Sequence, residues 1–146
     1  MNVRAVVREA LRSGTIAGVA MIPFAAVFRS FGLRVNEYGP KTLQLLVADA
    51  PAPFQSLLIL IQHIVISWFA AVPLVVGLSG TSDRPIRVLV GALYGAAFYI
   101  VVNSLALPFA FGDATPWSLG LVTVYPSLIV HVVFGVAVAL GARPSR

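Results

Sequence analysis

The sequence contains no cysteine and few charged residues, and each shortage excludes a class of protein. Without cysteine there is no disulfide, no thiolate metal site and no cysteine nucleophile. Charged residues make up 10% of the chain, against about 25% in a typical soluble domain. Because so few charges cannot cover a water-facing surface of ordinary size, the composition indicates a membrane protein.

Recognisable catalytic motifs are also lacking. The sequence has no phosphate-binding glycine loop, no HExxH zinc motif, no GxSxG motif and no sensibly placed serine, histidine and acid set. Its five carboxylates fall outside the long apolar blocks, which argues against a proton-coupled exchanger with a buried acid. The sequence therefore predicts that the protein is not an enzyme. The carboxylates are Glu9, Glu37, Asp49, Asp83 and Asp113.

What the sequence has in abundance is apolar residues, at 59% of the chain. They gather in four blocks, at about 14–31, 54–78, 86–107 and 117–141. At about 1.5 Å per helical residue, the last three exceed the ~30 Å hydrocarbon core, and the first is marginal. We expect one all-α membrane domain over 1–146, a bundle of four transmembrane helices. Thr115 is the expected N-cap of the last helix, with Pro116 at its first position.

Two shorter segments have the pattern of helices that lie on the membrane surface. Residues 3–12 place Arg4, Arg8 and Arg12 on one helical face beside an apolar one. This short basic amphipathic segment is suited to anionic lipid headgroups. A second interfacial helix is expected at 41–48, between two proline-containing breaks.

The distribution of basic residues predicts the orientation. With the N-terminus inside, seven of the ten basic residues fall in inner segments and three in outer ones. This positive-inside bias places both termini in the cytoplasm. The net charge of +5 is thereby explained by topology and lipid, and no nucleic-acid partner is expected. The inner residues are Arg4, Arg8, Arg12, Arg84, Arg87, Arg143 and Arg146; the outer ones are Arg29, Arg34 and Lys41.

A faint internal repeat runs through the four blocks. The first and third blocks open with a Gly-x-x-x-Gly pair, a common helix-packing motif, and the second and fourth carry a histidine followed by Ile-Val or Val-Val. Two parallel helical hairpins would give this order. The glycines expected at helix contacts are Gly14, Gly18, Gly91, Gly95 and Gly135.

His63 and His131 are the only two histidines, and both lie inside apolar blocks. Burying an ionisable residue in a membrane is costly, so each is a candidate functional residue. One interpretation is a pair of axial ligands to a b-type haem, or half of a metal site. The other, which we favour, is two neutral histidines hydrogen-bonded to Ser, Asn or backbone. The sequence itself predicts no metal site.

Further polar side chains share the expected inner face of the bundle. Asn103 falls on one helical face with Gly91, Gly95 and Tyr99. Such groups either form interhelical hydrogen bonds, which we favour, or line a polar path or small-molecule pocket that opens outward. The expected buried polar face comprises Gln62, Ser67, Asn103 and Ser127.

Several stretches resemble small bacterial inner-membrane proteins of the YagU type and related uncharacterised four-helix families. They are Gly14-x-x-x-Gly18, QHIVISWFA around His63, GALYG, ALPFAFG, and PSLIVHVVFG around His131. The resemblance runs from about residue 14 to 141, with a shorter loop between the first two helices. It implies an inner-membrane location and four helices, and no established activity.

Three functions follow from these observations. The first is a non-catalytic accessory or assembly subunit that packs against partner membrane proteins or against itself. The second is a haem- or metal-binding redox protein using His63 and His131. The third is an oligomeric channel or carrier for a small solute, lined by Asn103, Gln62 and the histidines.

Overall fold

The computed structural model describes residues 2–35, 38–47 and 51–143, and within these ranges it is all-α with no strand. Four of its helices are long and apolar enough to cross a membrane, so the predicted fold class is confirmed and the chain is a multi-pass membrane protein. The elements are α1 (Val3–Ser30), α2 (Tyr38–Leu46), α3 (Ala52–Gly77), α4 (Arg84–Phe98), the π-helix η1 (Tyr99–Ala106), α5 (Leu107–Phe111) and α6 (Leu121–Gly141).

The basic N-terminal segment and the first apolar block form the single helix α1. The Asn2 side chain caps its start by accepting a hydrogen bond from the Ala5 backbone N–H at 2.9 Å. The helix continues for 28 residues, or about 42 Å, until Gly32 takes a positive φ of 72°. The first span is therefore long enough for a membrane, and the basic segment forms its opening turns.

The third apolar block forms a continuous helical run from Arg84 to Phe111, past the end expected at residue 107. In α geometry the ring of Pro108 would clash with the carbonyl of Ser104, and proline has no N–H to donate. The wider π turns of η1 immediately precede Pro108 and give the ring room, so the helix continues to Phe111.

The last helix begins at Leu121 rather than at 117, and Thr115 is not its N-cap. A separate turn precedes it, in which the backbone N–H of Ser118 bonds the Thr115 carbonyl at 3.1 Å. Gly120 then takes a φ of 99°, which a residue with a Cβ rarely adopts. This glycine separates the turn from α6.

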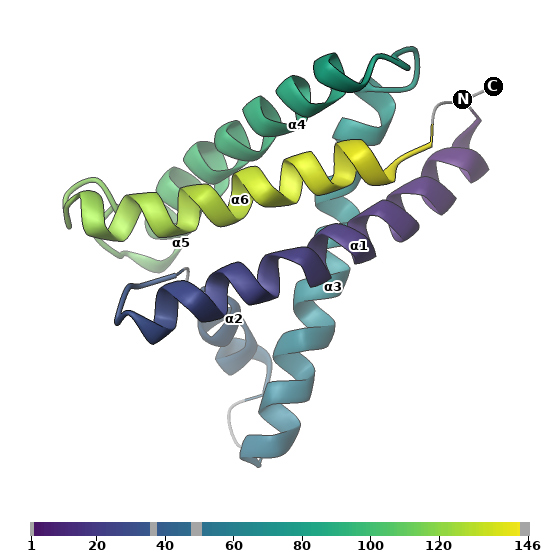
Figure 1. Ribbon diagram of the computed structural model, residues 1–146. Helices are drawn as coiled ribbons and strands as arrows, with labels where there is room; N and C mark the ends of the chain where they lie inside the picture. The colour runs from purple at the N-terminus through teal and green to yellow at the C-terminus, as the bar shows by residue number, and fades with distance from the viewer. Residues whose placement is uncertain (1, 36–37, 48–50, 144–146) are drawn as a thin grey trace.

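The four spans form an open row along most of their length, and one hydrogen bond, from the Tyr94 hydroxyl of α4 to the Ala70 carbonyl of α3 at 2.5 Å, joins the two edge helices. Extensive contacts join α3 to α1, α1 to α6, and α6 to α4, whereas α3 and α6 touch only lightly. Figure 1 shows α1 and α6 side by side, α4 behind α6, and α3 diverging from α4 and α6 toward its N-terminal end. The short helix α2 packs on α3. The start of α1, the end of α6 and the loop between α3 and α4 lie at one end of the molecule (Figure 1).

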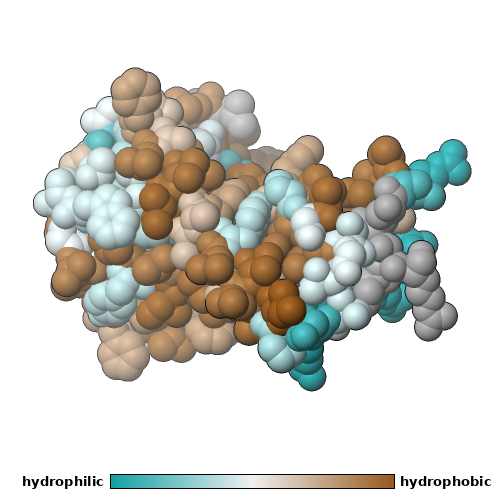
Figure 2. Space-filling model, turned by 90° about the horizontal axis from the view of Figure 1, so that it is seen from above, coloured by the Kyte–Doolittle hydropathy of each residue, from teal (hydrophilic) through white to brown (hydrophobic). Residues whose placement is uncertain are grey.

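Small side chains fill the interfaces between these helices, and large apolar ones face outward. Ala17, Ala71, Val138 and Ala139 are fully buried, as is usual where membrane helices approach closely. Figure 2 shows apolar side chains over most of the visible face, with strongly hydrophilic ones gathered mainly at the end that carries the start of α1. This distribution suits a lipid surround with one charged end in water.

Candidate functional site

The glycine pairs predicted from the sequence lie where helix backbones touch. A Cβ on Gly14 would lie 2.7 Å from the Ser67 carbonyl oxygen of α3, and one on Gly91 would lie 2.5 Å from the Gly135 carbonyl oxygen of α6. No real Cβ makes such contacts, so these positions require glycine. The two halves of the chain thus pack alike. In each half, the first glycine of the Gly-x-x-x-Gly pair contacts the residue four positions after the histidine, which is Ser67 in one half and Gly135 in the other.

His63 links the first pair of helices. Its Nε2 lies 3.0 Å from the Gly18 carbonyl oxygen of α1, and the Ser67 hydroxyl donates to the His63 carbonyl at 2.8 Å. The neighbouring Gln62 instead turns to α2, where its amide donates to the Thr42 hydroxyl at 2.5 Å. These polar groups of α3 therefore hold α1 and α2 in place.

His131 is 6% exposed and links the second pair of helices. Its Nδ1 lies 2.6 Å from the Ser127 carbonyl oxygen, and its Nε2 lies 2.8 Å from the side-chain nitrogen of Asn103. A carbonyl oxygen only accepts hydrogen bonds, so Nδ1 carries the proton and Nε2 accepts from Asn103. This arrangement holds His131 as the neutral Nδ1–H tautomer.

The histidine contacts bear on the haem interpretation. Both ring nitrogens of His131 already have protein partners, and Nε2 of His63 faces a backbone carbonyl. Axial ligation through any of these atoms would first have to break one of these hydrogen bonds. Among the described residues, no group of three or more His, Asp or Glu could hold a metal ion. The contacts seen are those of the structural interpretation, with Asn and backbone as partners.

A pocket of about 270 Å³ opens at the opposite end of the molecule from the start of α1. Asn103 and Ser127, from the predicted polar face, line it, whereas Gln62, His63 and Ser67 do not. The structure therefore divides the predicted polar set between two places, the pocket and the packing of α3. The pocket is lined by Arg34, Val35, Tyr38, Lys41, Tyr99, Asn103, Asp113, Ala114, Pro116, Leu119, Thr123 and Ser127.

Charged residues line the mouth of this pocket. Lys41 of α2 and Asp113, which follows α5, form an ion pair with 2.5 Å between Nζ and Oδ2. The hydrogen bond from Lys41 holds the pKa of Asp113 below its usual range, with further contributions from Tyr38 and Arg34. Burial, followed by the nearby Asp113 charge, raises the pKa of Tyr38. Among the described residues, the charged side chains that line the pocket are Arg34, Lys41 and Asp113.

The floor of the pocket is built on an irregular helix. Tyr99 and Asn103 both belong to η1 and both line the pocket. Short π segments within α-helices occur frequently at functional sites, since they give up regular hydrogen bonds. The hydroxyls of Tyr99 and Ser104 lie near each other but, within the described residues, complete no hydrogen bond of normal geometry. This part of the third span is the candidate functional site.

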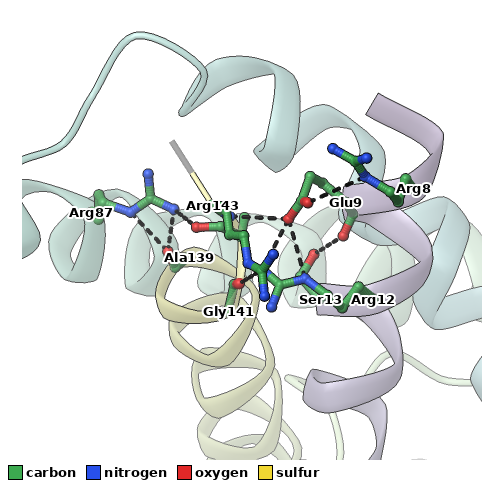
Figure 3. Close-up of polar contacts among 9 residues, drawn as sticks. Arg8, Glu9, Arg12, Ser13, Arg87, Ala139, Gly141 and Arg143 are labelled. Atoms are coloured by element: carbon green, nitrogen blue, oxygen red, sulfur yellow. Dashed lines mark hydrogen bonds and ion pairs between the residues drawn. The ribbon is translucent and has the colours of Figure 1, made fainter. Parts of the chain in front are cut away.

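A second polar cluster, which the sequence did not predict, lies at the other end of the molecule. Glu9 is 4% exposed, and its carboxylate accepts from the Arg12 guanidinium at 2.9 Å and from the Arg143 backbone N–H at 3.1 Å. Arg12 also donates to the Gly141 carbonyl. Figure 3 shows these groups converging from α1 and the end of α6.

Arg87 of α4 forms hydrogen bonds with the same end of α6. Its guanidinium donates to the carbonyl oxygen of Ala139 at 2.6 and 2.9 Å (Figure 3). It also donates to the carbonyl oxygen of Ala142 and, at 2.8 Å, to that of Thr81. The last carbonyls of a helix lack intrahelical donors and carry partial negative charge, which a guanidinium satisfies. A sequence signal existed, because Arg87 is the second residue of an apolar block. Its partners at the end of α6, however, are 52 and 55 residues away in the chain.

Comparisons with protein-family models, with curated proteins and with solved structures found no match to this chain.

Proposed function

We propose that this protein is a non-catalytic accessory or assembly subunit that packs against partner membrane proteins, or against a second copy of itself, through the two edges of its helix row. The observation that carries the proposal is the open order α3–α1–α6–α4. In a closed four-helix bundle each helix has two extensive neighbours. Here α3 and α4 each pack extensively against only one other span.

The edge helices present apolar side chains to their surroundings. Phe69 of α3 is 74% exposed and Leu93 of α4 is 62% exposed. Lipid can cover such groups, so exposure alone provides no drive to associate. Membrane helices associate instead through close packing, and the edge helices have unused faces where a further helix can pack. The open row therefore supports assembly more directly than the apolar surface does.

The arrangement of charges supports an inner-membrane orientation for this subunit. In the described chain, Arg4, Arg8, Arg12, Arg84, Arg87 and Arg143 belong to the end that holds the start of α1 and the end of α6. Arg29, Arg34 and Lys41 belong to the other end. By the positive-inside rule the first end faces the cytoplasm of a bacterial cell, where Arg4 and Arg8 are exposed to anionic lipid. The resemblance to YagU-type proteins implies the same membrane.

Site-specific crosslinking tests the proposal, and the chain is suited to it because it has no cysteine. Phe69→Cys and Leu93→Cys place a single thiol on each edge helix. Val19→Cys and Ile129→Cys place one on exposed sites of the middle helices α1 and α6. Each variant is labelled in native membranes with a maleimide that carries a photoactivatable group, and adducts are sized after illumination.

We expect discrete adducts from the two edge sites and few or none from the middle sites. An adduct of twice the chain mass identifies self-association, and any other discrete mass identifies a partner chain for sequencing. The proposal is overturned if all four positions yield only uncrosslinked protein, or if the middle sites give the same adducts as the edges.

A further inference from the structure

We propose that α2 is a lid on the pocket, held shut by the ion pair between Lys41 and Asp113, and that breaking this ion pair admits water-soluble molecules to the inner part of the pocket. The inference concerns access to the pocket, so it is independent of assembly through the edges of the helix row. It rests on three observations: how α2 is attached, how little of it is buried, and what lies beneath it.

The helix α2 is attached to the rest of the molecule on two sides. On one side, the Gln62 amide of α3 donates to the Thr42 hydroxyl at 2.5 Å. On the other side, Nζ of Lys41 lies 2.5 Å from Oδ2 of Asp113, which follows α5. The helix α2 therefore bridges α3 and the end of the third span, which are the two edges of the row.

The attachment to the α5 side is the weaker of the two. The side chains of Lys41 and Asp113 are 41% and 31% exposed. An ion pair that water reaches contributes little, and it contributes less as the salt concentration rises. Beside it, the Tyr38 ring lies 5.5 Å from the Phe111 ring. Because α2 packs on α3, we expect the α5 side to open first, with the α3 side as the hinge.

Little of α2 is buried, which lowers the cost of moving it. Leu43 is 7% exposed, but Leu45 is 75% exposed and Gln44 is also exposed. Segments with few buried apolar contacts open most readily in a folded protein. The helix also lies outside the four candidate spans, so the hydrocarbon core of the membrane does not hold it in place.

The pocket lies between this helix and two buried polar side chains. Tyr38 and Lys41 line it from α2, while Asn103 of η1 and Ser127 of α6 line it from the spans. Asn103 is 4% exposed and Ser127 is 5% exposed, so both are nearly closed off from water. The volume of about 270 Å³ holds roughly nine waters at ~30 Å³ each. Movement of α2 away from α5 would therefore open a cavity large enough for a small molecule.

Thiol labelling can measure this opening, because the chain has no cysteine. Ser127→Cys places a single thiol on the inner part of the pocket. A water-soluble, membrane-impermeant maleimide is added to the protein in nanodiscs, and the labelling rate is measured at low and at high salt. Ser13→Cys is the control thiol, because Ser13 is also buried but belongs to α1 near the opposite end of the molecule. It should react faster only if the whole fold loosens.

Three changes are combined with each thiol. Lys41→Gln and Asp113→Asn break the ion pair from its two sides. Arg29→Gln is the matched control for Lys41→Gln. It removes one positive charge at the same end of the molecule, from an exposed side chain that does not line the pocket.

We expect Lys41→Gln and Asp113→Asn each to speed the labelling of Ser127→Cys about two- to fivefold, the range that a partly exposed ion pair allows. Combining the two changes should add little, because either one alone breaks the ion pair. High salt should speed labelling when the ion pair is intact and have almost no effect in the two variants. Arg29→Gln should leave the rate of Ser127→Cys unchanged, and Ser13→Cys should respond to none of the changes.

The proposal is overturned if Ser127→Cys stays unlabelled in every variant, or if either Lys41→Gln or Asp113→Asn leaves its rate unchanged. It is also overturned if Arg29→Gln speeds the reaction equally, because the cause is then the charge at this end and not the ion pair. An equal acceleration at Ser13→Cys would overturn it as well, since the whole fold would then have loosened.

Discussion

Asn103 and His131 form a buried interhelical pair in which the asparagine amide donates to Nε2 across 2.8 Å. The pair joins η1 to α6 and fixes the tautomer of the only histidine in the second half of the chain. It also lies directly beneath the pocket, because Asn103 lines the cavity while His131 does not. The pair therefore couples the floor of the pocket to the packing of two spans.

Breaking this pair should destabilise the fold by a measurable amount. In Asn103→Leu, Nε2 of His131 stays buried without its donor, and we expect a loss on the order of 1–2 kcal/mol in the free energy of unfolding. Replacing His131 with Phe in the same variant should cost less than the two single changes added together. A double-mutant cycle on the protein in nanodiscs measures this coupling. A coupling of zero would show that the contact contributes nothing to stability.

Gly91 should not tolerate even a methyl group. A Cβ there would lie 2.5 Å from the Gly135 carbonyl oxygen and 2.8 Å from the Ala139 Cβ, so α4 and α6 must separate. We expect Gly91→Ala to lower the free energy of unfolding by about 1–3 kcal/mol, the usual range for overpacking. Gly77→Ala is the control, because in the described chain nothing lies within 4 Å of that added Cβ. The control should be neutral or slightly stabilising, since alanine favours a helix.

Arg87 should matter far more to stability than the neighbouring Arg84. Arg87 is 5% exposed and its guanidinium donates to carbonyls at the end of α6, whereas Arg84 is exposed. Losing charged hydrogen bonds of this kind costs about 1.5–3 kcal/mol. We therefore expect Arg87→Gln to lower the thermal unfolding temperature clearly and Arg84→Gln to leave it nearly unchanged. Equal effects would mean that only the charge at this end matters.

Hydropathy predicted the four spans because a membrane helix must satisfy its own backbone and present apolar side chains to lipid. The details that it missed depend on contacts distant in sequence. Glu9 was expected in a surface segment, yet it is buried because the Arg143 backbone N–H, 134 residues away, reaches its carboxylate. The continuation of the third span past Pro108 depends on the π turns of η1, which no periodicity in the sequence indicates.

The candidate site was predictable only in part, for a similar reason. Asn103, Ser127 and His131 stood out because a polar group inside an apolar block needs a partner. Arg34, Lys41 and Asp113 did not, because they lie outside the spans, where hydropathy does not determine how one segment folds over another. The structure brings the first group together on η1 and α6 and places the second above it.

The Lys41–Asp113 ion pair should give the outer end of the protein a defined dependence on pH. The pKa of Asp113 is lowered, chiefly by the hydrogen bond from Lys41. A lowered pKa in the folded state stabilises the fold above the unfolded value of about 4, and this contribution is lost as the pH falls through the folded pKa. The pair is therefore intact at pH 7, and its contribution begins to fall only below about pH 4.

Comparing the protein with Asp113→Asn tests this dependence. At pH 7 the unaltered protein should unfold at the higher temperature, by a small margin, because the ion pair is partly exposed to solvent. The margin should vanish in strong acid, where both proteins lack the carboxylate charge. Thermal unfolding followed by Trp117 fluorescence gives the measurement, in a Trp68→Phe background that removes the other tryptophan of the chain. A margin that stays constant from pH 7 to pH 3 would contradict the assignment.

Cysteine accessibility should settle which end of the molecule faces the cytoplasm. Ser82 lies in the loop between α3 and α4, at the end rich in arginine, and Ala114 lies in the loop after α5, at the other end. The chain has no native cysteine, so Ser82→Cys and Ala114→Cys each carry a single thiol. By the positive-inside rule, a membrane-impermeant maleimide added to intact spheroplasts should label Ala114→Cys at once. Ser82→Cys should react only after the membrane is opened. The reverse pattern would invert the protein in the membrane and place the pocket that Asn103 and Ser127 line on the cytoplasmic side.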